Sequence, residues 1–106
     1  MDHVELAELG RFADPAVLIL SSLAGGDKHG YALVKDIEQF AGVKLGPGTL
    51  YGALGRLAQR GLVEALAAEE RRRPYRLTGR GATALRAYLL HTREVAQVGL
   101  IRLARA

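Results

Sequence analysis

The chain has 106 residues, of which 49% are hydrophobic and 25% are charged, so a single globular, soluble domain is expected. It contains no cysteine, which excludes disulfides, thiolate metal sites and thiol nucleophiles. Residues 1–40 carry three Lys or Arg against seven Asp or Glu, whereas residues 41–106 carry twelve against four. A basic half of this kind either attracts a polyanion or is a solvated surface.

Two short helices are expected before residue 25. Irregularly spaced apolar residues predict an amphipathic helix near the N-terminus: Val4, Leu6, Leu9, Phe12 and Ala13. Asp14 and Pro15 then indicate a helix start, because Asp accepts from free backbone N–H groups and Pro fits the first turn. A largely buried helix over residues 16–23 follows, and Gly25 and Gly26 end it.

A helix-turn-helix is expected next. Residues 27–30 form a loop, and residues 31–41 form a helix that ends at Gly42. The apolar residues of this helix fall three or four positions apart: Leu33, Val34, Ile37 and Phe40. Residues 43–46 form the turn, and a further helix runs from Pro47 to Arg60, with Gly61 as its stop signal.

The helix from Pro47 has one buried face and one face of small residues. Leu50, Leu54 and Leu57 define the buried face. The opposite face holds Gly48, Gly52, Gly55 and Gln59. Thr49 and Arg56 lie on one side of it, and Tyr51 lies on the other. A Gly inside a helix costs about 1 kcal/mol relative to Ala, so we expect this face to serve the close approach of a partner. The alternative is an ordinary surface helix in which Tyr51 is packing.

A basic β-hairpin is expected after Gly61. Residues 62–67 and 72–77 form its strands, residues 68–70 form a polar tip, and Pro74 predicts that the second strand lies at an edge. The run Arg71–Arg73 either contacts phosphates or is a solvated turn paired with Glu69 and Glu70. The whole order predicts a winged helix-turn-helix, mainly α with a small β-hairpin wing (α+β).

A long helix ends the chain. Thr78 is its expected N-cap, and it runs from Gly79 to Leu103, about 37 Å at 1.5 Å per residue. The preceding small domain cannot cover its apolar stripe, so a second copy of the chain is expected to do so. The residues expected at this dimer interface are Leu6, Leu9, Phe12, Leu85, Tyr88, Leu89, Thr92, Val95, Ala96, Leu100 and Leu103. Residues 1–77 would then be the DNA-binding domain with its N-terminal helix, and residues 78–106 the C-terminal dimerisation helix.

Several motifs between residues 16 and 89 resemble the PadR family of bacterial transcription regulators. They are His29-Gly30-Tyr31, Gly48-Thr49-Leu50-Tyr51, Leu54, Arg56-Leu57, Gly61-Leu62-Val63-Glu64 and Tyr75-Arg76-Leu77-Thr78. The resemblance implies a homodimeric winged-helix regulator, usually a repressor at inverted-repeat operators, which in some members releases DNA when a small aromatic molecule binds. Gly52 and Gly55 depart from the family, which often has a Pro and a basic or polar residue there.

The residues expected to contact double-stranded DNA lie on the two helices of the motif, on the turn and on the hairpin. They are Tyr31, Lys44, Gly48, Thr49, Tyr51, Gly52, Arg56, Arg71, Arg72, Arg73 and Arg76. His29 is expected to cap the helix that follows it rather than to contact DNA. Because few side chains of the glycine-bearing helix can form hydrogen bonds, we expect much of the specificity to come from DNA shape.

Other functions find less support in the sequence. No Ser/His/Asp set, paired carboxylates, phosphate loop or metal-ligand spacing of histidines stands out, so we expect no enzyme, cofactor or metal site.

Phe12, Tyr88 and Val95 either line a ligand cavity between subunits or pack the dimer. The alternatives to DNA binding are a winged-helix protein-interaction module and a ligand carrier. The acidic N-terminus and the short apolar run of residues 16–20 predict no signal peptide and no membrane span, so we expect a cytoplasmic protein. The resemblance to PadR regulators implies a bacterial protein associated with the nucleoid.

Overall fold

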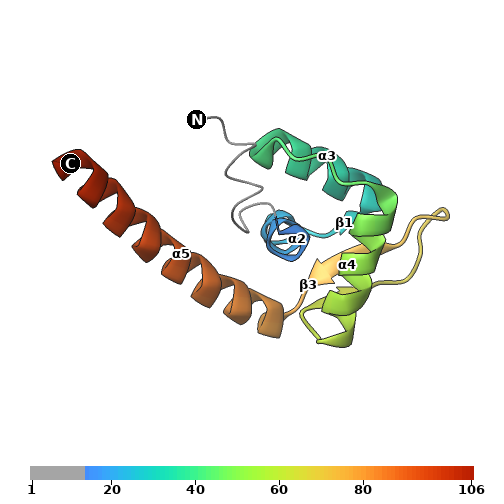
Figure 1. The fold of residues 1–106 in the computed structure, drawn as a ribbon. Coiled ribbons are helices and arrows are strands. Elements are labelled where there is room, and N and C mark those ends of the chain that lie inside the picture. The colour runs from blue at the N-terminus through green and yellow to red at the C-terminus, as the bar shows by residue number, and fades with distance from the viewer. Residues whose placement is uncertain (1–13) are drawn as a thin grey trace.

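A computed structural model describes residues 14–106 and has four helices and three short strands in this range (Figure 1). The elements are α2 (Pro15–Leu23), β1 (Lys28–His29), α3 (Gly30–Ala41), α4 (Pro47–Gln59), β2 (Val63–Ala65), β3 (Pro74–Leu77) and α5 (Gly79–Arg105). The mainly α fold with a small wing is therefore confirmed. The expected N-terminal helix, with Leu6, Leu9 and Phe12, lies outside the described residues.

The helix boundaries follow the capping signals of the sequence. Asp14 Oδ1 accepts a hydrogen bond of 2.9 Å from the backbone N–H of Ala16, which starts α2. Gly42 ends α3 in the left-handed conformation, with φ of 69°, and Gly61, with φ of 74°, follows the end of α4. Thr78 caps α5 by accepting from the N–H of Gly81 at 3.0 Å. These positions confirm the expected helices to within one or two residues at each end.

The sheet differs from the expected hairpin in having a third strand. Its order is β1-β3-β2, and Lys28 and His29 pair with Tyr75 and Pro74. The prediction of a plain loop over residues 27–30 was therefore wrong, because two residues are too few to show the alternation that marks a strand. The prediction of an edge strand for Pro74 was also wrong. Pro74 is the first residue of the central strand, where a missing N–H is tolerated.

The paired strands of the wing are shorter than the sequence suggested, and the wing turns later. The paired strands are only Val63–Ala65 and Pro74–Leu77, whereas residues 62–67 and 72–77 were expected. A separate bridge between Glu69 and Arg72 closes the hairpin, so the tip is Glu70 and Arg71 rather than residues 68–70. Both tip residues have positive φ, 48° and 71°, as a two-residue hairpin turn requires. Neither is Gly or Asn, so the sequence carried no signal for this turn.

The core lies where α2 is surrounded by α3, α4 and the sheet (Figure 1). The largest apolar side chains that are fully buried there are Ile19, Leu33, Ile37, Leu50 and Leu54. The buried face predicted for residues 50, 54 and 57 is thus confirmed. α2 is also tied to α3 by a polar contact, since Ser22 Oγ donates to Asp36 Oδ2 at 2.6 Å and Lys28 Nζ lies 3.9 Å from the same oxygen.

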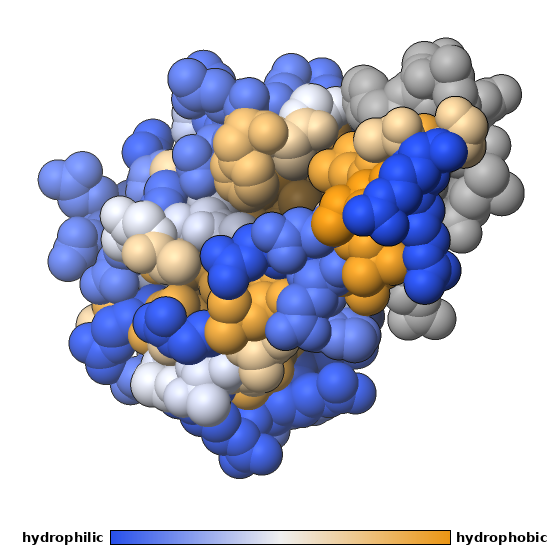
Figure 2. Space-filling view, turned by 90° about the vertical axis from the view of Figure 1, so that its left-hand side faces the viewer, coloured by the Kyte–Doolittle hydropathy of each residue, from blue (hydrophilic) through white to orange (hydrophobic). Residues whose placement is uncertain are grey.

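The first turns of α5 are fixed to the winged domain, and the rest extends away from it (Figure 1). Thr78 Oγ1 donates to the carbonyl of Gly61 at 2.6 Å, and Gly81 packs so closely on Leu62 that a side chain there would overlap its carbonyl oxygen. Within α5, Gly81 and Leu85 are buried. The large apolar residues beyond them are exposed: Tyr88, Leu89, Leu90, Val95, Val98, Leu100, Ile101 and Leu103. Figure 2 shows hydrophobic surface gathered on the side where α5 ends.

Candidate nucleic-acid interface

The outward face of α4 consists mainly of small residues. Gly48, Thr49, Gly52 and Gly55 are exposed, and Tyr51 is 53% exposed. A Cβ added at Gly48 or Gly55 would meet no atom within 4 Å, and one at Gly52 would meet only the Arg56 side chain at 3.5 Å. The packing of the chain itself therefore does not require these glycines. A partner that approaches the backbone of α4 closely would require them.

One hollow collects residues from three parts of the chain. It has a volume of about 440 Å³ and lies between the start of α3, the first turns of α4 and the wing. Its lining consists of His29, Gly30, Tyr31, Tyr51, Arg71, Arg72, Arg73 and Tyr75. Five of the residues expected to contact DNA, namely Tyr31, Tyr51 and the three arginines of the wing, thus surround one concave surface. Three phenol groups and three guanidinium groups suit a phosphate backbone, which accepts hydrogen bonds and carries negative charge.

Tyr51 crosses from α4 to the start of α3. Its hydroxyl lies so close to Gly30 that a Cβ added at residue 30 would overlap it. Gly30 is buried and has the helical conformation, so its absent side chain matters for space rather than for backbone freedom. The sequence offered the signal in the motif His29-Gly30-Tyr31, but the reason for the glycine is its contact with a residue 21 positions away.

The start of α3 orients two other side chains of the hollow. Lys35 Nζ lies 5.3 Å from the centre of the Tyr31 ring, one turn along the helix. His29 caps α3 as expected, since its Nδ1 accepts from the N–H of Ala32, although at 3.5 Å. Its other nitrogen, Nε2, lies 3.4 Å from Arg72 Nη1, a contact the sequence gave no reason to expect.

Arg71, Arg72 and Arg73 have no carboxylate partner in the described part of the chain. Within residues 14–106, no carboxylate oxygen lies within 4.0 Å of the guanidinium groups of Arg71, Arg72 or Arg73. Glu69 and Glu70 share the tip with them but form no ion pair there. The alternative of a turn closed by internal charge pairs therefore loses its basis, and three exposed cations remain beside the hollow.

Arg76 stands apart from the other basic residues expected to contact DNA. Its guanidinium donates to Glu64 Oε2 at 2.7 Å across the β2–β3 pair. That hydrogen bond and the negative charge of Glu64 raise the pKa of Arg76. Because side chains alternate along β3, Arg76 points away from Tyr75 and does not line the hollow. Lys44 and Arg56 are exposed, in the turn and on α4, but likewise do not line it.

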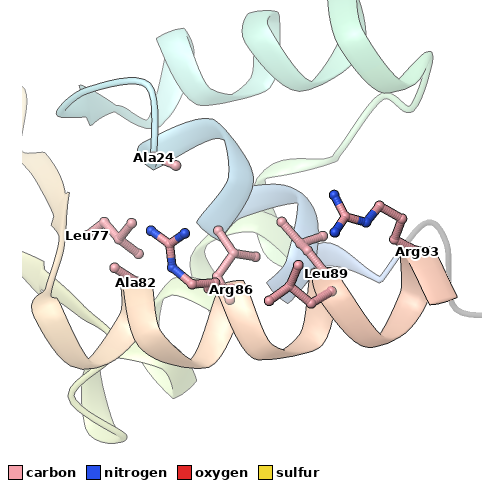
Figure 3. A pocket seen from close by; sticks show the side chains of 8 residues that line it. Ala24, Leu77, Ala82, Arg86, Leu89 and Arg93 are labelled. Carbon is pink, nitrogen blue, oxygen red and sulfur yellow. The ribbon is translucent and has the colours of Figure 1, made fainter.

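A second hollow, of about 370 Å³, lies between the end of α2 and α5 (Figure 3). Its walls are mainly apolar, and Arg86 and Arg93 reach from α5 toward α2 beside them. Tyr88 and Val95, named as ligand residues from the sequence, do not line it, and Phe12 lies outside the described residues. Among residues 14–106, no helix is both long and apolar enough to cross a membrane.

Comparison with known proteins matches residues 19–87 to the model of the transcriptional regulator PadR-like family. A transcriptional regulator from Clostridium thermocellum has a similar structure, with 30% identity and a TM-score of 0.71 over 78% of this chain and 86% of that one. A PadR family transcription regulator from Clostridium difficile R20291 has 28% identity and a TM-score of 0.73, over 84% of this chain and 94% of that one.

A curated relative is a much longer protein. It is an uncharacterized 37.1 kDa protein in transposon TN4556 of Streptomyces fradiae, 49% identical over 71 residues. The match takes in 67% of this chain and 21% of the relative, so it spans about a fifth of the relative's length.

Proposed function

Because the chain belongs to the transcriptional regulator PadR-like family of DNA-binding regulators, we propose that it acts as a homodimer that represses transcription from an inverted-repeat operator. In this proposal α4 enters the major groove, and the wing lies along the phosphates. The proposed contacts are those expected from the sequence, except that Arg76 is engaged by Glu64.

The observation that carries the proposal is the hollow between α3, α4 and the wing. It joins the exposed tyrosines Tyr31 and Tyr51 to arginines that have no carboxylate partner in the described part of the chain. A basic concave surface beside a flat helix face fits a duplex whose backbone passes through the hollow while base edges meet α4.

Dimerisation is supported by the exposed apolar residues of α5. Leu100 and Leu103 are 67% and 74% exposed, and the helix runs for 27 residues from its fixed base. A contiguous apolar face of this length favours pairing with a second copy. The proposed domains meet at Thr78, although Gly81 and Leu85 still pack on the winged domain. A small aromatic effector would then bind between the subunits, where Tyr88 and Val95 are exposed.

Binding to duplex DNA at a series of salt concentrations tests the proposal. The logarithm of the binding constant should fall with the logarithm of salt with a slope of about −0.9 for each neutralised phosphate. A promoter fragment with an inverted repeat should bind more tightly than an unrelated fragment. A slope near zero, or no binding to any duplex at low salt, would favour the alternative of a winged-helix module that contacts protein.

A further inference from the structure

His29 lies between two hydrogen-bond donors. Its ring sits where β1 meets α3, with Nδ1 3.5 Å from the backbone nitrogen of Ala32 and Nε2 3.4 Å from Arg72 Nη1. A neutral imidazole has one N–H and one lone pair, so it can accept from only one of these two neighbours. A protonated ring could accept from neither. In every protonation state, at least one N–H group of the His29 ring therefore faces another hydrogen-bond donor.

The cap of α3 favours one tautomer of the His29 ring. The contact with Ala32 is partly buried and helps to satisfy the first turn of a 12-residue helix, whereas the contact with Arg72 is exposed and water can replace it. This cap therefore favours the tautomer in which Nδ1 keeps the lone pair and Nε2 carries the hydrogen. In this tautomer Nε2–H and the guanidinium of Arg72 are two donors side by side, and no residue among those described accepts hydrogen bonds from both.

We propose that a backbone phosphate of bound DNA supplies this acceptor, one phosphate oxygen taking hydrogen bonds from both His29 Nε2–H and Arg72. The inference rests on the proposed DNA binding and adds His29 to the contact residues. An oxygen about 2.9 Å from each donor fits between nitrogens 3.4 Å apart.

The surroundings of the pair fit a phosphate rather than a group of the protein itself. His29 and Arg72 both line the hollow that holds Tyr31 and Tyr51. The nearest carboxylates at the wing, Glu69 and Glu70, line an adjoining hollow with His29 and Arg72 but make no ion pair with Arg72. Through the shared phosphate, DNA would join the start of α3 to the wing.

A double-mutant cycle tests the shared phosphate. The variant His29→Asn keeps a good N-cap acceptor but has no group at the position of Nε2–H, and Arg72→Gln removes the charge. Binding of a promoter duplex is measured by fluorescence anisotropy at several salt concentrations, with thermal unfolding as the check on folding. Arg73→Gln is the matched control, because it removes a neighbouring charge that does not contact His29.

We expect His29→Asn to weaken binding by about tenfold, the usual effect of losing one hydrogen bond to a charged group. Its salt slope should not change, since a neutral donor neutralises no phosphate. Arg72→Gln should weaken binding and reduce the slope by about 0.9. The double variant His29→Asn/Arg72→Gln should lose less affinity than the product of the two single losses, because both substitutions remove contacts to one phosphate. The affinity loss of His29→Asn/Arg73→Gln should equal the product of its two single losses.

A second measurement on the DNA keeps the test independent of any variant's stability. Duplexes with a neutral methylphosphonate at one phosphate at a time should include one position that weakens the wild type more than it weakens either His29→Asn or Arg72→Gln, and that does not affect the double variant. If the wild type binds DNA and His29→Asn binds within twofold of it, the phosphate site is wrong. Purely multiplicative effects of the substitutions at His29 and Arg72 would also overturn the site. Either result would leave the proposed function standing. Absence of wild-type DNA binding would overturn the proposed function and this site together.

Discussion

Tyr51 and Gly30 show how two motifs far apart in the sequence form one contact. The hydroxyl of Tyr51 lies so close to Gly30 that the Cβ of any other residue there would overlap it. The side chain of Tyr51 is thereby held over the start of α3, on the wall of the hollow. The absence of a side chain at Gly30 therefore allows Tyr51 to extend from α4 over the start of α3.

We predict that Gly30→Ala weakens operator binding by about tenfold by displacing Tyr51, comparable to Tyr51→Ala, in the range expected for losing one specific contact. Anisotropy titrations measure both. The matched control is Tyr51→Phe, which removes the overlapping hydroxyl and leaves Cζ, 3.0 Å from the new Cβ, as the nearest atom of the ring. Gly30→Ala should cost clearly less in that background. An equal loss in both backgrounds would mean that the contact does not position Tyr51.

The helices could be predicted because their signals are local. Caps such as Asp14, Gly42 and Thr78 and the spacing of buried leucines on α4 depend on neighbours within a few positions. The sheet order, the tip at Glu70 and Arg71, and the ion pair of Arg76 with Glu64 depend on which segments meet in space. For the same reason the sequence indicated Tyr31, Tyr51 and the three arginines as candidates but missed Gly30, Tyr75 and the second contact of His29.

The wing is the element on which we expect general affinity to depend. Replacing Arg71, Arg72 and Arg73 together with Ala should weaken binding to operator and unrelated DNA alike, because phosphate contacts carry no sequence information. The salt slope should become shallower by up to about 2.7, or 0.9 for each lost phosphate contact. Competition titrations with both DNAs measure this. A change of sequence preference without a change of slope would contradict the role given to the wing.

The base of α5 is the element on which the direction of the long helix depends. Gly81→Ala should reduce the free energy of unfolding by about 2–3 kcal/mol, because the new Cβ would overlap the carbonyl oxygen of Leu62 and lie 2.8 Å from Leu77 Cδ1. Gly79→Ala is the control two residues away, since a Cβ there meets no atom within 4 Å. Urea unfolding of both variants measures the difference. Equal stability of the two would show that α5 does not pack as closely as described.

The molecule is organised as a winged domain with a long amphipathic helix, α5, fixed to it. Because Thr78 and Gly81 fix the first turns of α5, the direction of the helix is set by the domain that carries α4. In the proposed dimer, pairing through α5 would therefore also set the separation of the two α4 helices. This link makes subunit pairing and operator recognition a single property of the assembly.

Leu89→Asp should abolish dimerisation and operator binding together, since a charge placed on the apolar stripe would be buried in the proposed interface. Sedimentation velocity gives the oligomeric state, and anisotropy gives the affinity. The control Ala87→Asp adds the same charge to an exposed position of α5 that was not assigned to the interface. A monomeric Leu89→Asp variant that still bound the operator tightly would separate the two properties.

Hydroxyl-radical footprinting of the wild type on its promoter duplex tests most directly whether two α4 helices address one duplex. We predict two protected segments related by the inverted repeat, with centres about 10–10.5 base pairs or a multiple of that apart. A single protected segment, or protection spread evenly along the duplex, would contradict the proposed arrangement.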